Sequence, residues 1–423
     1  MNSQQIAAFF SSCPAGGAYG NAQAAPAFGA VNMAQSTVQF VGVTGHAGKT
    51  TVCGMVTGIL QQAGFTCGCY TVGAAPLKER IRVDGKPVQV AVLSKPAAAL
   101  QKLPAPPPCT VAELAAACAC FSAAGCQFAV VELPDASLAA FLPRLPVGVI
   151  TLIGDDGSGF APERLAQSAA ALMRKGSVVV TAPNQPKAVL SELVVAAAQK
   201  GCGLKVPEID DLTYSGKKLR GSCDYGGYEF LLPQPGCAAA ENAAVAVETA
   251  LELWKKGVEI EDEAILAGVP LVGAESGLHY LRHRPRILAD PCHKPLQAAA
   301  LARSLASAGL GKVSVIAGLT DCMDPEAFFA ALEGGFVPDD EQNDKKRMAG
   351  MSDNPVQMVY CVTPEGEDAV PADETEQQAR FHFDTEICDS LQQALEMAQE
   401  DEPDALVVLG GEAVCRAAAA LFQ

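Results

Sequence analysis

A glycine-rich stretch near the amino terminus contains the residue types that bind a polyphosphate. Residues 42–51 read Gly-Val-Thr-Gly-His-Ala-Gly-Lys-Thr-Thr, between a β-branched run and a segment with helical spacing. Glycines let backbone N–H groups approach phosphate oxygens, and the following helix N-terminus adds unpaired N–H groups and a positive dipole end. A lysine can reach the β and γ phosphates, and a threonine hydroxyl can bind Mg²⁺. The stretch predicts a site for ATP and Mg²⁺, with the nucleotide held by Gly45, His46, Ala47, Gly48, Lys49, Thr50 and Thr51.

The segments around this phosphate-binding loop (P-loop) predict an α/β fold. Val38–Val43 is expected to be a strand and Lys49–Ala63 a helix, and further strands and helices alternate after them. Such alternation is typical of a mainly parallel sheet with helices on both faces. The alternation restarts at Arg286. We therefore expect a P-loop domain and a smaller, Rossmann-like C-terminal α/β domain.

Composition and periodicity divide the chain into three regions. Residues 1–35 are rich in Ala, Gly, Ser and Asn with little periodicity, which predicts a loose N-terminal segment. Residues 36–274 are expected to form the P-loop domain, and residues 275–423 the C-terminal domain. Within the latter, the polar stretch 338–354 is expected to be an exposed loop.

Composition also argues against several classes of partner. The formal net charge of -17 disfavours binding to a nucleic-acid backbone. No stretch approaches the roughly 20 apolar residues of a membrane-spanning helix, and the first residues lack the basic start of a signal peptide. We therefore expect a cytoplasmic protein that binds neither nucleic acid nor membrane. Its 16 cysteines are scattered without a CxxC pair, which favours buried thiols over a metal site.

The loop resembles the Gly-Ile-Thr-Gly-Thr-Asn-Gly-Lys-Thr-Thr loop of the Mur ligase superfamily and differs from it at Val43, His46 and Ala47. Within that superfamily, further segments follow the order found in folylpolyglutamate and dihydrofolate synthases. These segments are 79–85 (Glu-Arg-Ile-Arg-Val-Asp-Gly), the strand 128–132, the strand 149–154, 241–246 (Glu-Asn-Ala-Ala-Val-Ala), 290–295 (Asp-Pro-Cys-His-Lys-Pro) and the closing strand and helix 405–422.

The resemblance implies an ATP-dependent ligase that acts on a small-molecule carboxylate and an amino acid. In that family ATP phosphorylates the carboxylate, and the amine attacks the acyl phosphate to give an amide, ADP and phosphate. The catalytic residues implied here are Lys49, Asp290 and His293. Asn242 would lie beside the nucleotide, and the metal ligands would be Thr50, Thr51 and Glu132.

Several residues of the family pattern are absent. Asp155 and Asp156 stand where a metal-binding His is expected; either could bind Mg²⁺ through its carboxylate, or both could lie in a solvated loop. Ala169 occupies the position of a lysine that is carbamylated in the family. Residues 275–279 lack the expected arginine, and 74–77 retain only part of a Ser-Pro-His-Leu substrate motif.

These departures leave three functions open. The chain could be an active carboxylate-amine ligase with a changed substrate, as the loop, Glu132, Asp290 and His293 suggest. It could instead be a catalytically weak relative that binds ATP and acts as a regulatory or partner subunit. A plain P-loop kinase or ATPase would explain the loop but not the second domain.

Overall fold

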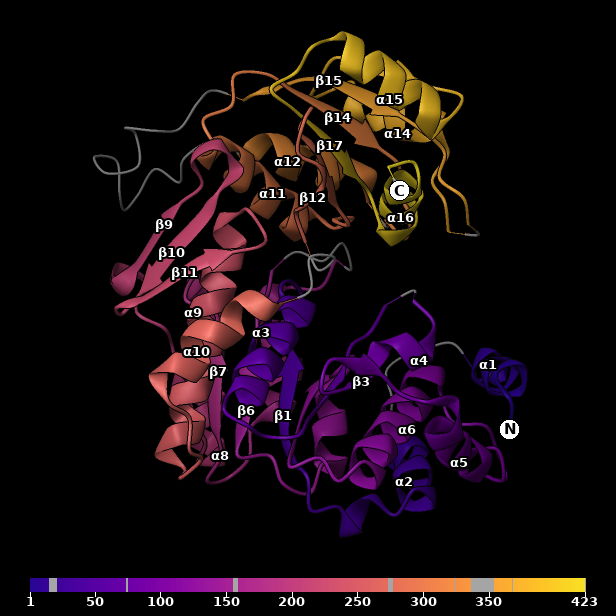
Figure 1. The fold of residues 1–423 in the computed structure, drawn as a ribbon, viewed down its shortest axis with the longest axis vertical. Helices are drawn as coiled ribbons and strands as arrows, with labels where there is room; N and C mark the ends of the chain where they lie inside the picture. The colour runs from indigo at the N-terminus through magenta and orange to yellow at the C-terminus, as the bar shows by residue number, and fades with distance from the viewer. Residues whose placement is uncertain are drawn as a thin grey trace. The chain divides into compact units, whose positions relative to one another are not determined.

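The structure is a computed structural model of the 423-residue chain. It describes residues 1–14, 21–73, 75–154, 159–272, 277–322, 324–335, 354–366 and 368–422. The chain forms two compact units, whose helices and strands are labelled in Figure 1. The first unit comprises Met1–Ile153, Ala161–Ile209 and Asn242–Val272, and the second comprises Gly154–Phe160, Asp210–Glu241 and Gly273–Gln423.

The first unit contains an eight-stranded sheet in the order β4-β3-β2-β5-β1-β6-β7-β8. Strands β2, β5, β1, β6, β7 and β8 are parallel, and β3 and β4 add an antiparallel edge. Its strands are β1 (Gln39–Thr44), β2 (Cys67–Tyr70), β3 (Ile81–Val83), β4 (Lys86–Pro87), β5 (Phe128–Glu132), β6 (Val147–Ile150), β7 (Val178–Thr181) and β8 (Gly203–Lys205). The central strands β1, β5 and β6 are almost entirely buried, as expected of parallel strands covered on both faces.

Helices pack on both faces of this sheet. Helix α3 contacts β1, β2 and β5, while α1, α2 and α5 pack against α6 in the main core. The helices of the first unit are α1 (Ser3–Ser12), α2 (Asn21–Ala30), η1 (Met33–Gln35), α3 (Lys49–Gln62), α4 (Leu77–Arg80), α5 (Val90–Leu100), α6 (Cys109–Ala123), η2 (Ala136–Phe141), α7 (Pro162–Ala169), η3 (Ala170–Leu172), α8 (Lys187–Lys200), η4 (Ile209–Asp211, which ends in the second unit), α10 (Asp262–Gly268), η6 (Val269–Leu271) and the part of α9 (Cys237–Lys255) from Asn242 onward.

The N-terminal region is helical where the structure describes it, so the expectation of a loose segment is wrong for residues 1–14 and 21–35. Asn2 forms a capping box with Gln5 at the start of α1. Ile6, Phe9 and Phe10 recur at helical spacing and are buried in the core of the first unit. Burial of this short apolar stripe outweighs the Ala- and Gly-rich composition that suggested a loose segment.

The second unit contains a six-stranded sheet in the order β12-β13-β17-β14-β15-β16, parallel except for β12. A separate antiparallel sheet has the order β11-β10-β9. The strands are β9 (Leu212–Ser215), β10 (Gly221–Tyr225), β11 (Tyr228–Leu232), β12 (His279–Arg282), β13 (Ile287–Asp290), β14 (Val313–Ala317), β15 (Val356–Cys361), β16 (Thr385–Ile387) and β17 (Ala405–Leu409). The helices are η5 (Lys217–Leu219), α11 (Pro295–Ser307), α12 (Pro325–Gly334), α14 (Ala372–Ala379), α15 (Leu391–Glu400) and α16 (Glu412–Ala420).

The predicted fold class is confirmed, because both large sheets are mainly parallel and alternate with helices along the chain. Residues 210–241, which the sequence places in the P-loop domain, group with the second unit. The predicted boundary between 274 and 275 and most of the predicted loop 338–354 fall outside the described residues. The domain bounds 36–274 and 275–423 therefore stay a prediction.

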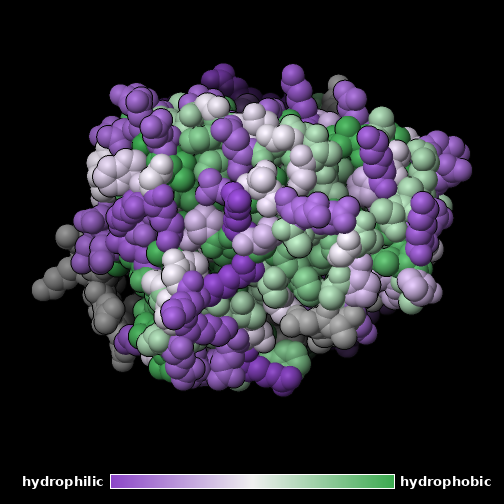
Figure 2. Space-filling model, turned by 90° about the horizontal axis from the view of Figure 1, so that it is seen from below, coloured by the Kyte–Doolittle hydropathy of each residue, from purple (hydrophilic) through white to green (hydrophobic). Residues whose placement is uncertain are grey.

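Exposed apolar side chains come from separate elements of the structure. Among them are Trp254 of α9, Leu231 of β11 and Phe381 after α14. On the face shown in Figure 2, hydrophilic residues are interspersed with hydrophobic ones. None of the helices that the structure describes is both long and apolar enough to cross a bilayer.

The helix that follows the glycine-rich loop is held by a close backbone contact. A Cβ atom added to Gly58 of α3 would overlap the carbonyl oxygen of Gly268 at the end of α10, and one added to Gly268 would overlap the backbone of Ile59. The two helices therefore approach more closely than side chains allow. This contact ties the second half of α3 closely to α10.

We expect Gly58→Ala to destabilise the protein by about 2 kcal/mol, because an extra methyl group in a packed interface forces the backbones apart. Gly29→Ala in α2 is the matched control, since a Cβ there has no neighbour within 4 Å. The measurement is the unfolding midpoint in urea. Equal midpoints for the two variants would contradict the close packing of α3 on α10.

Candidate functional site

The predicted phosphate loop connects β1 to α3, and its shape requires two glycines. Gly45 and Gly48 have φ values of 121° and 90°, which disfavour any residue with a Cβ. A Cβ at Gly45 would overlap the Thr151 hydroxyl, and a Cβ at Gly48 would overlap the Asn242 side-chain amide. The Asn242 side chain on α9 therefore lies directly against the loop, and its predicted place beside the nucleotide stays a prediction.

The end of β6 holds the first half of the loop in place. The backbone N–H groups of His46 and Ala47 both donate to the carbonyl oxygen of Leu152, at 3.0 and 3.2 Å. Thr151 donates to the Thr44 carbonyl through its N–H group (2.8 Å) and its hydroxyl (3.2 Å). These loop N–H groups are thus engaged within the protein. The first turn of α3, which starts at Lys49, is then the part with N–H groups oriented for an anion.

A buried glutamine supports this strand end from the other side. The Gln185 side chain accepts from the Ile153 N–H at 3.0 Å and donates to the Thr151 carbonyl and the Thr181 hydroxyl, both at 2.9 Å. Gln185 is 8% exposed, so its hydrogen bonds are made away from solvent. No local pattern in the sequence indicates this role for Gln185, and Thr151 is recognisable only as part of the strand 149–154.

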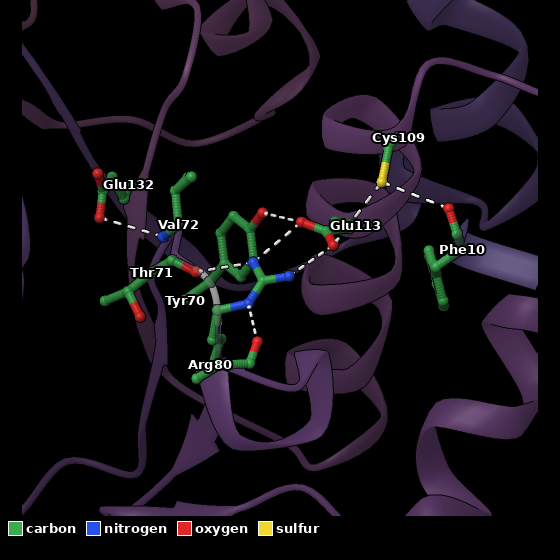
Figure 3. Close-up of polar contacts among 9 residues, drawn as sticks. Phe10, Tyr70, Thr71, Val72, Arg80, Cys109, Glu113 and Glu132 are labelled. Carbon is green, nitrogen blue, oxygen red and sulfur yellow. Dashed lines mark hydrogen bonds and ion pairs between the residues drawn. The ribbon is translucent and has the colours of Figure 1, made fainter. Parts of the chain in front are cut away.

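Glu132 ends β5 next to the loop and is 4% exposed. Its carboxylate accepts a hydrogen bond from the Thr50 hydroxyl at 3.1 Å and one from the Val72 N–H at 3.2 Å. The Lys49 Nζ lies 3.7 Å from the other carboxylate oxygen. Figure 3 shows the contact between Glu132 and Val72. The structure thus brings together the Lys49 ammonium group, the Thr50 hydroxyl and the Glu132 carboxylate at the start of α3.

These donors fit a hard divalent cation. Mg²⁺ is usually held by one or two carboxylates together with substrate phosphates and water. The Thr50 hydroxyl and the Glu132 carboxylate supply oxygen donors, and Thr51 is buried on the same helical turn. Within the described ranges no group of three or more His, Cys, Asp or Glu side chains could hold a metal ion. A metal held by these two donors would need further ligands, and phosphate oxygens and water are the usual ones.

The remaining predicted site residues belong to other segments of the chain. Asp155 and Asp156 lie outside the described residues, so their predicted role as metal ligands stays a prediction. Ala169 is buried at the end of α7. Asp290 and His293 belong to the second unit.

Asp290 ends β13 and starts a tightly hydrogen-bonded turn. Its carboxylate accepts from the Cys292 N–H at 2.9 Å, and the His293 N–H donates to the Gln297 side chain at 3.1 Å. The Nδ1 atom of His293 lies 3.0 Å from the Pro291 carbonyl oxygen. Burial raises the pKa of the Asp290 carboxyl to about 6, although the Cys292 N–H opposes the shift. A carboxyl group with this pKa can exchange a proton close to neutral pH.

The raised pKa predicts a pH-dependent effect of Asp290→Asn. Because the folded pKa of about 6 exceeds the ordinary value of 3.8, the native carboxyl favours folding most at low pH and loses this contribution as pH rises through 6. As the pH rises from 4 to 7, the free energy of unfolding of the variant should therefore increase relative to that of the native protein. Thermal unfolding of both proteins across this range measures the difference. A difference that is flat, or that falls with pH, would contradict the raised pKa.

The fold is that of folylpolyglutamate and dihydrofolate synthases, which confirms the resemblance at the level of the fold. No protein-family model matches the sequence, and no curated protein does. The Mycobacterium tuberculosis folylpolyglutamate synthase complexed with ADP has a TM-score of 0.79 and 19% identity, covering 99% of this chain and 98% of that one.

Two further solved structures are similar over the same length. The Yersinia pestis bifunctional folylpolyglutamate synthase/dihydrofolate synthase complexed with AMPPNP and a Mn ion has a TM-score of 0.80 and 19% identity, covering 100% of this chain and 98% of that one. The Escherichia coli FolC in complex with DHPP and ADP has a TM-score of 0.79 and 20% identity, with coverage of 100% and 98%.

Proposed function

We propose that this chain is an ATP-dependent ligase that joins a carboxylate to an amine through an acyl phosphate. The observation that carries the proposal is the meeting of Lys49, Thr50 and Glu132 beside the glycine-rich loop. The nucleotide and Mn bound in the similar structures support a nucleotide and a divalent cation as its cofactors. We propose Mg²⁺ as the cation, because the donors are oxygen atoms.

The loop residues have distinct tasks in this mechanism. The first turn of α3 and Lys49 bind the β and γ phosphates and offset their negative charge. A bound Mg²⁺, held by the threonine hydroxyls of residues 50 and 51 and by Glu132, would polarise the γ-phosphoryl group. A carboxylate oxygen of the substrate then attacks the γ phosphorus and ADP leaves. Asn242, whose side chain lies against Gly48, would lie beside the nucleotide.

The second step forms the amide. The amine nitrogen attacks the acyl carbon, phosphate leaves with the electron pair of the acyl–oxygen bond, and the nitrogen loses a proton. We propose Asp290 and His293 as the catalytic residues of the second unit. A carboxyl with a pKa of about 6 would accept the proton of an attacking amine. Asp155 and Asp156 stay proposed as further metal ligands.

A second function is favoured by a different residue. Ala169 cannot be carbamylated, and it stands where the resembling family has the modified lysine. Less fixed charge at the phosphoryl group would slow its transfer, since electrostatic stabilisation is usually the largest catalytic effect. The alternative is a catalytically weak ATP-binding protein that acts as a regulatory or partner subunit. Both functions require the nucleotide site, and they differ in turnover.

We expect Lys49→Ala to weaken Mg-ATP binding about tenfold to a hundredfold, because a charge-assisted hydrogen bond contributes roughly 1.5–3 kcal/mol. Lys95→Ala, on the exposed side of α5, is the matched control and should bind as the native protein does. Isothermal titration calorimetry measures both affinities. Equal Mg-ATP affinities of the two variants would contradict the proposal that the nucleotide binds at the loop.

For the ligase itself, we expect ADP release that requires a carboxylate and an amine together. The measurement is ADP release over a panel of carboxylic acids and amino acids, with Glu132→Gln as the variant that loses the metal carboxylate. The ligase predicts release by the native protein and at least about a tenfold loss in the variant. Nucleotide binding without ADP release on any pair would instead favour the regulatory subunit.

A further inference from the structure

A buried charge cluster lies beside the site but is not used by the mechanism above. Arg80, at the end of α4, forms a forked ion pair with Glu113 of α6, with N–O distances of 2.9 and 2.5 Å. Tyr70, the last residue of β2, donates its hydroxyl hydrogen to the same carboxylate at 3.0 Å. The side chains of the ion pair are only 9% and 10% exposed. Figure 3 shows the three residues together.

This cluster is costly as a purely stabilising device. Removing two charges from water costs several kcal/mol per ion, and apolar residues of similar size often stabilise a protein as well or better. A buried forked pair does give one thing that apolar packing does not, which is a fixed orientation of its donors and acceptors. The donors that remain on Arg80 therefore indicate what the pair orients.

Those donors reach the segment that leads to Glu132. The Arg80 Nε donates to the Ala75 carbonyl at 2.8 Å, and one terminal nitrogen donates to the Thr71 carbonyl at 3.3 Å. The Thr71 N–H donates back to the Arg80 carbonyl at 3.2 Å. The next residue, Val72, donates its N–H to Glu132 at 3.2 Å. A continuous path of polar contacts and one peptide bond thus joins Glu113 to the proposed metal ligand.

We propose that Arg80 and Glu113 are positioning residues for the metal carboxylate. Glu113 fixes the Arg80 guanidinium, Arg80 fixes the backbone at Thr71, and Val72 then holds one oxygen of Glu132. The other oxygen is left on the side of Lys49. This inference rests on the proposed function, because it assumes that Glu132 binds a divalent cation in the presence of nucleotide.

Loss of the positioning contacts should weaken metal binding without removing any metal ligand. Groups that orient a ligand through a hydrogen bond typically contribute 10- to 100-fold to metal affinity. Glu113 acts on such a group, the Val72 N–H, only through Arg80 and the Thr71–Val72 peptide, so its effect should lie at the low end of this range. We therefore expect Glu113→Gln to lower the affinity for the cation by about tenfold.

The test is Mn²⁺ binding, followed by electron paramagnetic resonance of the free ion, in the presence of a non-hydrolysable ATP analogue. Analogue binding in EDTA is measured alongside. Glu113→Gln should lose about tenfold in Mn²⁺ affinity and keep the metal-free analogue affinity. Glu252→Gln is the matched control, since it removes a largely buried carboxylate paired with Lys255 on α9. It should leave Mn²⁺ affinity unchanged.

A double variant separates positioning from general destabilisation. In a Glu132→Gln background, Glu113→Gln should have no further effect on Mn²⁺ affinity, because the group that it positions is already lost. An additive effect would overturn the inference. Arg80→Lys keeps the charge but cannot form the fork, and it should also weaken Mn²⁺ binding. If Glu113→Gln shows no cooperative unfolding transition, and so is not properly folded, Arg80→Lys serves as the test variant in its place.

Failure of this inference is distinguishable from failure of the proposed function. If the native protein with the analogue binds no Mn²⁺, the proposed metal site is wrong and the inference falls with it. If the native protein binds Mn²⁺ and neither Glu113→Gln nor Arg80→Lys changes the affinity, only the positioning role is overturned. A loss in the variants equal to that in Glu252→Gln would also overturn it.

Discussion

The buried carboxylate of Glu132 imposes the strongest constraint on the first unit. A carboxylate this far from water is stable only when charged or hydrogen-bonding groups surround it. Its partners come from the start of α3 and from the chain after β2. Parallel pairing of β5 with β1 and with β2 brings these segments to the same edge of the sheet. The sheet order therefore supplies the hydrogen-bonding and charged partners that this buried carboxylate needs.

The glycine-rich loop obeys a second constraint, which is backbone crowding. It must pass between Thr151 and the Asn242 side chain, and each contact excludes a Cβ at the facing position. Since Leu152 also binds two loop N–H groups, the end of β6 determines the loop conformation. The loop is consequently set before any ligand binds. A preformed anion site loses little conformational entropy on binding, and such preorganisation favours tight nucleotide binding.

Patterns in the sequence are sufficient to predict the elements whose structure depends on residues close together in the chain. The strand, loop and helix around Lys49 and the strand that ends in Glu132 were predicted nearly at their observed bounds. The apolar spacing of Ile6, Phe9 and Phe10 is also present, although the Ala- and Gly-rich composition around it points to a loose segment. Gln185 follows an Asn and precedes a Pro and carries no such signal.

The same limit applies to the charge cluster beside the site. Glu113 sits in an Ala-rich helix, where a single acidic residue is typical of a solvated face, and only the tertiary fold brings Arg80 to it. Residues that act through contacts between distant segments cannot be identified from spacing alone, because the contacts depend on strand order. The role of such residues is decided by the fold and not by the motif that contains them.

The proposed cation site has few oxygen donors among the described residues, and this has a consequence for how such a site would work. A cation held by Glu132 and threonine hydroxyls would depend on nucleotide phosphates for part of its coordination. Binding of cation and nucleotide must then be mutually favourable, since coupling between two ligands is reciprocal. Such a site senses the complex of the two and responds weakly to either one alone. Such coupling would suit a ligase, which transfers the γ phosphate to a carboxylate. It would suit equally a regulatory subunit that responds to Mg-ATP. The two functions would therefore use the same nucleotide site and differ only in whether the phosphoryl group is transferred.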